Sequence, residues 1–156
     1  TYIAQLVSNK GFIVATDPVS KRLSRLRENC DRLGVACEIR ENLHPGELFD
    51  RVLVDVPCSN TGVLRRRVDL RWRISPRDLK RFQKTQLEIL LQAAKFVKPG
   101  GVLVYSTCSL EPEENQQVTQ LFASKTPEMI PGEERILTPF ADGVDGAYVA
   151  KFVRKC

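Results

Sequence analysis

The stretch RVLVDVPCS at residues 51–59 decides the fold of this chain, because an apolar run ends there in a carboxylate and a cysteine. Runs of this kind are typical of strands buried on both faces of a parallel sheet. The stretch GVLVYSTCS at residues 101–109 has the same form. Open α/β sheets bind ligands at the carboxyl ends of their strands. We therefore expect Cys58 and Cys108 to meet in one pocket.

Strand-like and helix-like segments alternate before residue 51. Residues 11–17 are predicted to form a strand that ends in Asp17. Ser20 is expected to cap a helix whose apolar residues recur at spacings of three and four, and Gly34 is expected to end it. Another strand is predicted at residues 35–40. The alternation predicts an α/β fold, with a mostly parallel sheet and helices on both faces.

The alternation continues between and after the two cysteine-containing stretches. Ser75 is expected to cap a helix whose apolar stripe covers residues 79–97, with residues 98–101 as its end. Residues 145–153 are predicted to form a closing strand. Residues 127–141 are expected to be a loop with one short strand at most.

The composition fits one globular domain with a substantial core, since 42% of the 156 residues are hydrophobic and 28% are charged. The five cysteines show no CxxC spacing, and we expect no signal peptide, which favours a reduced, cytoplasmic protein. With His44 as the only histidine, we expect no metal site. No apolar stretch approaches the ~20 residues of a membrane span, so we expect no membrane partner.

Positive charge is concentrated in residues 65–81, called here the basic segment. It holds eight basic and two acidic side chains, an excess of +6, whereas the other 16 basic and 17 acidic side chains give −1. Such a distribution is typical of a surface that contacts phosphates, although a solvated helix face is the alternative. The residues that we expect to bind RNA are Arg65, Arg66, Arg67, Arg71 and Arg73.

Four motifs occur in order along the chain: DVPCSNTGVLRR at 55–66, YSTCS at 105–109, PEEN at 112–115 and DGAYVAK at 145–151. With these motifs the chain resembles the Sun/Fmu (RsmB-like) family of S-adenosylmethionine-dependent RNA cytosine-C5 methyltransferases, from residue 1 to about residue 155. The resemblance implies a Rossmann-like methyltransferase fold. It also implies that the substrate is a cytosine of small-subunit ribosomal RNA.

Two thiols suit this chemistry, because C5 of cytosine becomes nucleophilic only after a thiolate has added to C6. The residues alone do not assign the roles, since DNA cytosine methyltransferases carry their nucleophile in a Pro-Cys turn like that of Cys58. The resemblance implies that Cys108 is the nucleophile and that Cys58 assists release of the product. It also implies that Asp55 holds the N3 and amino edge of the base, whereas a turn cap is the alternative.

The resemblance further implies which residues bind S-adenosylmethionine. Asp17 corresponds to the acidic residue that accepts hydrogen bonds from the ribose, with a helix cap as the alternative. Arg22 corresponds to a basic residue near the cofactor, or lies at the surface. Asn42 stands where the family has an aspartate that meets the adenine amino group, and its carbonyl can accept without charge. Asp55 completes this set.

The family's first strand and glycine-rich loop precede the residues that match Thr1. We therefore expect residues 1–156 to be an N-terminally incomplete methyltransferase catalytic domain with weak or no affinity for the cofactor by itself. A non-catalytic RNA-binding module with a methyltransferase-like fold is the main alternative. A methyltransferase acting on DNA fits the ring chemistry but not the order of the motifs.

Overall fold

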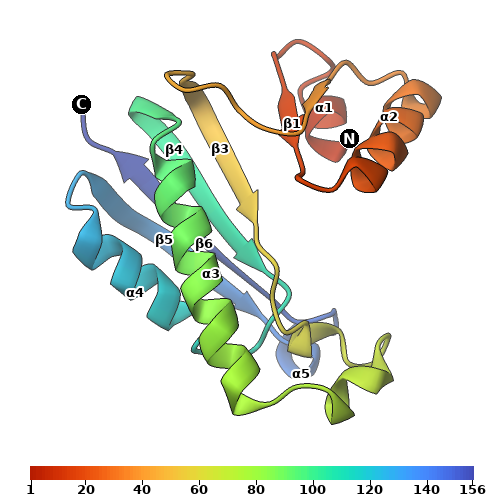
Figure 1. Ribbon diagram of the computed structural model, residues 1–156, viewed down its shortest axis with the longest axis vertical. Coiled ribbons are helices and arrows are strands. Elements are labelled where there is room, and N and C mark those ends of the chain that lie inside the picture. Colours follow the sequence, from red (N-terminus) through yellow and green to blue (C-terminus); the bar gives the residue numbers. More distant parts are fainter. The chain divides into compact units, whose positions relative to one another are not determined.

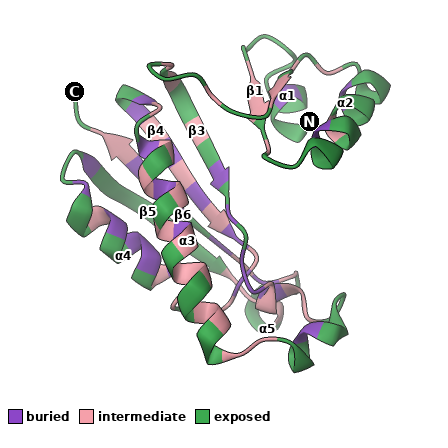
Figure 2. Cartoon of the chain, viewed as in Figure 1, coloured by how far each residue is buried: buried purple, intermediate pink, exposed green.

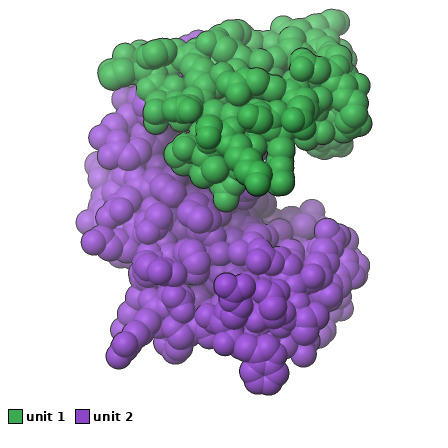
Figure 3. All heavy atoms as spheres, turned by 45° about the vertical axis from the view of Figure 1, so that its right-hand side comes forward, with its two compact units in different colours: residues 1–47 green, residues 48–156 purple.

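The computed structural model describes residues 1–156, which divide into two compact units, Thr1–Glu47 and Leu48–Cys156 (Figure 3). Each unit has its own sheet, with two strands in the first and four in the second. The helices are all too short or too polar to cross a membrane.

The first unit contains α1 (Tyr2–Leu6), β1 (Val14–Thr16), α2 (Ser20–Leu33) and β2 (Glu38–Arg40). β1 and β2 pair in parallel, with Val14 opposite Glu38. α2 buries Leu23 and Cys30 on its inner side, and it ends at Gly34, which takes the left-handed conformation that favours glycine. The predicted order of strand, helix and strand is confirmed.

The start of α2 differs in one detail from the expectation. Its N-cap is Val19, and Ser20 is the first helical residue and makes no capping hydrogen bond. Asp17 performs this local task, since its Oδ1 accepts a 2.8 Å hydrogen bond from the Val19 backbone N–H. A carboxylate two residues before the N-cap satisfies a free backbone donor as well as a serine can.

The second unit contains the remaining elements: β3 (Phe49–Asp55), η1 (Thr61–Val63), η2 (Val68–Trp72), α3 (Pro76–Ala94), β4 (Val97–Thr107), α4 (Gln116–Lys125), β5 (Met129–Leu137), α5 (Pro139–Asp142) and β6 (Ala147–Arg154). The strand order in the sheet is β3-β4-β6-β5. β3 and β4 run in parallel, and β6 is antiparallel to both β4 and β5. Figure 1 shows α3 and α4 side by side against this sheet.

The core of the second unit lies between the sheet and these two helices. Inward-facing residues alternate along β4 and β6, as the burial colours of Figure 2 show. The ring of Phe122 on α4 packs edge-on against Phe152 of β6 at 4.8 Å between centroids. Leu90 on α3 and Leu103 on β4 are fully buried in the same cluster. This core fixes the ends of β3 and β4, which lead into the turns that carry Cys58 and Cys108.

The α/β fold is confirmed, but the sheet of the second unit is mixed rather than mostly parallel. Two of its three strand pairings are antiparallel, because β6 enters between β4 and β5 from the opposite direction. α3 and α4 contact each other and share one face. β3 is an edge strand, and Leu53 is 54% exposed instead of buried on both faces.

Two further boundaries differ from the sequence analysis. Val97 was expected to end the helical stripe, but α3 stops at Ala94 and Val97 opens β4. Residues 129–137, expected to be mainly loop, form the nine-residue strand β5. The hydrogen bonds that define β5 come from pairing with β6. This pairing is a tertiary contact, which local strand propensity does not predict.

Candidate active site

The candidate active site is formed where β3 and β4 end. Asp55 at the end of β3 lies opposite Ser106 of β4, so the chain leaves both strands at one edge. We call residues 56–59 the first cysteine turn and residues 106–109 the second. The Sγ atoms of Cys58 and Cys108 are 3.2 Å apart. The structure thus brings the two predicted thiols into direct contact.

Asn60 defines the direction of the hydrogen bonds between the thiols. Its backbone is left-handed, and its Nδ2 donates a 2.8 Å hydrogen bond to the carbonyl oxygen of Cys58. Its Oδ1 therefore faces Cys108, whose S–H donates to it at 2.9 Å. A protonated Cys108 that donates to Asn60 leaves only the Cys58 proton for the contact between the two sulfur atoms. Cys58 donates and Cys108 accepts.

This asymmetry gives the two thiols different acidities. The hydrogen bond from Cys58 lowers the pKa of Cys108 below the ordinary value of a cysteine, against the opposing effect of burial. The same hydrogen bond, together with burial, raises the pKa of Cys58, which is only 6% exposed. A thiolate is the nucleophilic form of cysteine. Cys108 is therefore the better placed of the two to attack.

Asp55 lies beside this pair. Its carboxylate is exposed, and its Oδ1 accepts a 3.3 Å hydrogen bond from the Ser106 hydroxyl. Its negative charge is near enough to work against the lowered pKa of Cys108. The structure thus brings together the three residues predicted to be catalytic, with the carboxylate free to meet a ligand.

Two glycines, which the sequence analysis did not single out as site residues, allow the turns to approach each other. The Gly62 N–H donates to the carbonyl oxygen of Cys108 at 3.0 Å, and the Gly146 N–H donates to the carbonyl oxygen of Gly62 at 2.8 Å. A Cβ on Gly62 would lie 2.3 Å from the Gly146 oxygen. Only glycine fits so close an approach of two backbones. Their presence in two of the four sequence motifs was the available signal.

The basic segment is not one solvated helix face, since it runs through η2 and into the first turns of α3. Arg65 and Arg66 both form ion pairs with Asp145, at 2.6 and 2.8 Å. Arg73 pairs with Asp69 at 3.3 Å, whereas Arg67 and Arg71 have no ion pair. The predicted RNA-binding arginines thus differ in how much charge they can offer to a phosphate.

A cavity of about 210 Å³ connects the first cysteine turn to the basic segment. Cys58 and Asn60 line one part of it, and Arg67, Arg73 and Arg81 line another. Trp72 is 88% exposed and stands between two arginines in the sequence. Positive charge with an exposed aromatic ring is the combination that binds unpaired nucleotides.

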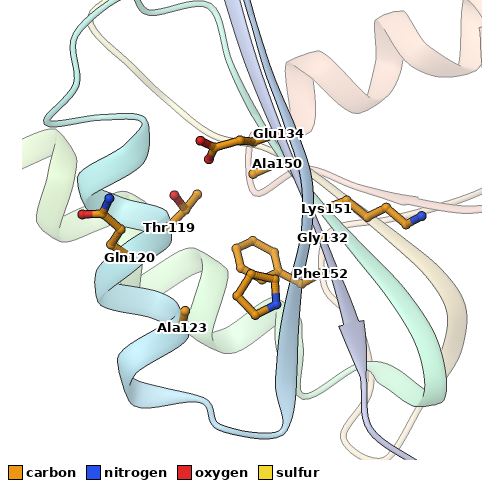
Figure 4. A pocket seen from close by; sticks show the side chains of 9 residues that line it. Thr119, Gln120, Ala123, Gly132, Glu134, Ala150, Lys151 and Phe152 are labelled. Carbon is orange, nitrogen blue, oxygen red and sulfur yellow. The ribbon is translucent and has the colours of Figure 1, made fainter.

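A second pocket, of about 120 Å³, lies between α4 and the strands β5 and β6. In Figure 4, Thr119 and Ala123 line it from the helix and Phe152 from the sheet. It contains neither cysteine turn and no residue of the basic segment. It is therefore separate from the candidate active site.

Three of the predicted cofactor residues belong to the first unit and Asp55 to the second. Asp17 follows β1, and Asn42 lies two residues after β2, so both lie at the carboxyl ends of neighbouring parallel strands. Oδ2 of Asp17 forms a 3.3 Å ion pair with Arg22. Asn42 is exposed. Within the first unit these residues therefore share the strand edge at which such sheets bind ligands.

Comparison with known proteins identifies the family of the chain. Residues 1–153 match the protein family described as 16S rRNA methyltransferase RsmB/F. The chain is 36% identical to the ribosomal RNA small subunit methyltransferase B of Klebsiella pneumoniae strain 342, and 38% identical to that of Enterobacter sp. strain 638. Each match covers 96% of this chain but only 38% of the relative. The chain thus spans well under half the length of these relatives.

Two solved archaeal structures are also similar over most of the chain. NSun6 from Pyrococcus horikoshii with SFG, an analogue of S-adenosylmethionine, has a TM-score of 0.88 and 30% identity, covering 97% of this chain and 44% of its own. A methyltransferase homologue from Pyrococcus horikoshii has a TM-score of 0.83 and 33% identity, covering 99% of this chain and 57% of its own. The fold is therefore that of Rossmann-like, S-adenosylmethionine-dependent methyltransferases. Together with the matched family, these likenesses establish that the chain belongs to the 16S rRNA methyltransferase RsmB/F family.

Proposed function

We propose that this chain carries the catalytic centre of an enzyme that methylates C5 of a cytosine in small-subunit ribosomal RNA. The observation that supports it best is the 3.2 Å contact between Cys58 and Cys108, in which Cys58 is the donor. On this proposal residues 1–156 belong to a methyltransferase catalytic domain that acts in the cytoplasm, where bacterial ribosomes are assembled.

Cys108 is the proposed nucleophile. Its thiolate adds to C6 of the target cytosine, and the electron pair of the C5–C6 double bond becomes available at C5. One difficult step is thereby divided into easier ones. The lowered pKa of Cys108 favours the thiolate before attack, and its partial exposure leaves the sulfur open to the base.

Cys58 is the proposed assistant in product release. After methylation, the proton at C5 passes to a water molecule and its electron pair re-forms the C5–C6 double bond. The bond between C6 and Cys108 breaks, returning an electron pair to the Cys108 sulfur. The Cys58 sulfur lies 3.2 Å from that sulfur, so its S–H can donate a hydrogen bond that stabilises the departing thiolate. Its raised pKa keeps Cys58 protonated while this happens.

Asp55 is the proposed contact for the N3 and amino edge of cytosine. A carboxyl group can accept from the amino group and can hydrogen-bond to or protonate N3, which stabilises charge that develops in the ring. The Ser106 hydroxyl holds one of its oxygens, so the other remains available.

The methyl donor of the family is S-adenosylmethionine, which supplies an electrophilic methyl group when bound. The chemistry of the residues fits it. The Asp17 carboxylate can accept from ribose hydroxyls, Arg22 holds that carboxylate in place, and the exposed Asn42 amide can accept from the adenine amino group. Asp55 is the fourth proposed contact.

The five arginines of the basic segment are the proposed RNA contacts. Arg67 and Arg71 are the strongest candidates because no carboxylate neutralises them. Arg73 lines the cavity beside Cys58, where it can meet a phosphate next to the target nucleotide. Arg65 and Arg66 both form ion pairs with Asp145, so they offer less net positive charge to a phosphate.

Product analysis tests the proposal. A full-length enzyme that carries this chain is incubated with under-methylated small-subunit RNA and labelled cofactor, and the nucleosides are identified by mass spectrometry. We expect 5-methylcytidine from the native enzyme and from a Cys30→Ala control, and none from Cys108→Ala. A methyl group on another atom, or full activity of Cys108→Ala, would contradict the proposal.

A further inference from the structure

Each catalytic cysteine is followed by a serine, and these serines meet in the interior. Ser59 and Ser109 are buried, and their hydroxyl oxygens are 3.1 Å apart. Both hydroxyls donate to the same oxygen, Oε2 of Glu114, with 2.5 Å between Ser109 Oγ and this oxygen. One carboxylate oxygen therefore joins the two cysteine turns.

The other oxygen of Glu114 holds the first turn from a second direction. Its Oε1 accepts hydrogen bonds from the Ser59 backbone N–H at 2.8 Å and from Gln86 Nε2 at 2.9 Å. Gln86, on α3, also donates to the carbonyl oxygen of Pro57 at 3.0 Å. The Tyr105 hydroxyl donates to the backbone carbonyl oxygen of Glu114 at 2.6 Å. This hydrogen bond anchors Glu114 to β4, the strand that carries Tyr105.

Glu114 is an unusual residue to find at this place. It is 0% exposed and forms no ion pair, although burying an unpaired carboxylate is costly. Four hydrogen bonds from neutral donors satisfy its two oxygens. Both oxygens are used to hold residues of the two cysteine turns or of Gln86, which itself binds the first turn. The burial therefore calls for an explanation from the site.

We propose that Glu114 is a positioning residue that sets the spacing of the Cys58 and Cys108 thiols by binding the serine after each of them. Each serine is covalently adjacent to its cysteine, so a shift of either turn moves a sulfur atom. The contact between the sulfur atoms depends on that spacing, because hydrogen bonds weaken steeply with distance and angle. The inference rests on the two-thiol mechanism for its catalytic meaning, but the spacing can be measured separately.

The spacing is measured by the rate at which Cys58 and Cys108 form a disulfide in the reduced full-length enzyme that carries this chain. Diamide is the oxidant: an S–S bond forms, both thiol protons and two electrons pass to diamide, and diamide becomes the hydrazine. The product is identified by mass spectrometry of peptides. The S–S bond requires the sulfur atoms to approach to about 2.05 Å. The rate of this disulfide closure therefore reports how well the two turns are aligned.

We expect Glu114→Ala to slow this closure by ~10-fold or more, since four buried donors lose their acceptor. Glu114→Gln should stay near the native rate. Its Nε2 can donate to both serine hydroxyls, and its Oε1 can still accept from Ser59 N–H and Gln86. Glu113→Ala is the matched control, because the Glu113 side chain makes no hydrogen bond, and it should not change the rate.

Closure of Glu114→Ala at the native rate would overturn the proposal, as would a Glu114→Gln rate as slow as that of Glu114→Ala. If circular dichroism shows that Glu114→Ala does not fold, Ser109→Ala decides, because it removes one of the two hydroxyls that share the carboxylate. Slow closure in a folded Ser109→Ala supports the proposal, and native closure contradicts it.

Activity separates this inference from the proposed function. In the full-length enzyme, Glu114→Ala should lower kcat and leave the KM for RNA unchanged, and Glu114→Gln should restore kcat. If the native enzyme does not make 5-methylcytidine but closure depends on Glu114 as expected, the reaction is wrong and the positioning role stands. If methylation needs Cys108 but Glu114→Ala keeps the native kcat, the positioning role alone fails.

Discussion

The two cysteine turns follow neighbouring strands, share the Cys-Ser pattern and converge on one carboxylate, but they place their thiols in different surroundings. Cys58 is buried and donates a hydrogen bond to the other sulfur, whereas Cys108 is partly exposed and accepts it. The basic segment comes after the first turn, and three glutamates come after the second. Similar local sequences thus acquire different chemistry from burial and from hydrogen-bond direction.

The largest effect on this arrangement is expected from Gly62→Ala. The added Cβ would meet the backbone oxygens of Gly146 and Cys108 at 2.3 and 2.8 Å, so the turns must separate. We expect a loss of ~1–3 kcal/mol in the free energy of unfolding, the usual cost of overpacking. Urea denaturation measures it. Gly11→Ala is the control, because its Cβ would have only a 3.6 Å contact. Equal stability of the two variants would contradict the close approach.

A smaller effect is expected from replacing arginines of the basic segment. This segment follows the first cysteine turn in the sequence, and the second turn has no counterpart. In the full-length enzyme, replacing Arg67 and Arg71 with glutamine should reduce the slope of log affinity for single-stranded RNA against log salt by about 1.4, or ~0.7 for each lost contact. Replacing Arg65 and Arg66 should reduce it less, because Asp145 already pairs with both. Fluorescence anisotropy across a salt series provides the slopes. Identical slopes in the native enzyme and in both double variants would show that RNA does not bind the basic segment.

The smallest effect concerns the acidity of Cys108. Iodoacetamide reacts with thiolates, so its rate of reaction with Cys108 rises with pH through the pKa of that thiol. The Cys58 hydrogen bond lowers this pKa, so Cys108 should react at lower pH than Cys58. In Cys58→Ala the donor is lost, and the midpoint for Cys108 should move to higher pH. Peptide mass spectrometry follows each cysteine, and an unchanged midpoint would show that the thiols are not coupled.

Much of the fold and the convergence of the thiols could be predicted from local sequence. The apolar runs before Asp55 and Cys108 place both turns at strand ends. Ser75 caps α3 as expected, accepting from the Asp78 N–H in a capping box. These features depend on periodicity and caps, which neighbouring residues in the sequence determine.

Features that depend on tertiary contacts could not be predicted in this way. β5 contains Pro131 and Gly132, which disfavour strands locally, yet pairing with β6 stabilises it. Glu114 stands in an acidic run that is typical of a solvated surface, and only the folded chain brings Ser59 to it. The direction of the hydrogen bond between the sulfur atoms likewise depends on Asn60, which packing holds in a left-handed conformation.

The division of labour between the two turns is tested most directly by trapping the covalent intermediate. Native full-length enzyme, Cys58→Ala and Cys108→Ala are each incubated with cofactor and under-methylated small-subunit RNA, then resolved on denaturing gels. Because Cys108 forms the bond to C6 and Cys58 assists its breakage, the protein–RNA adduct should accumulate in Cys58→Ala and be absent in Cys108→Ala. An adduct that persists in Cys108→Ala, or that accumulates in neither variant, would contradict these roles.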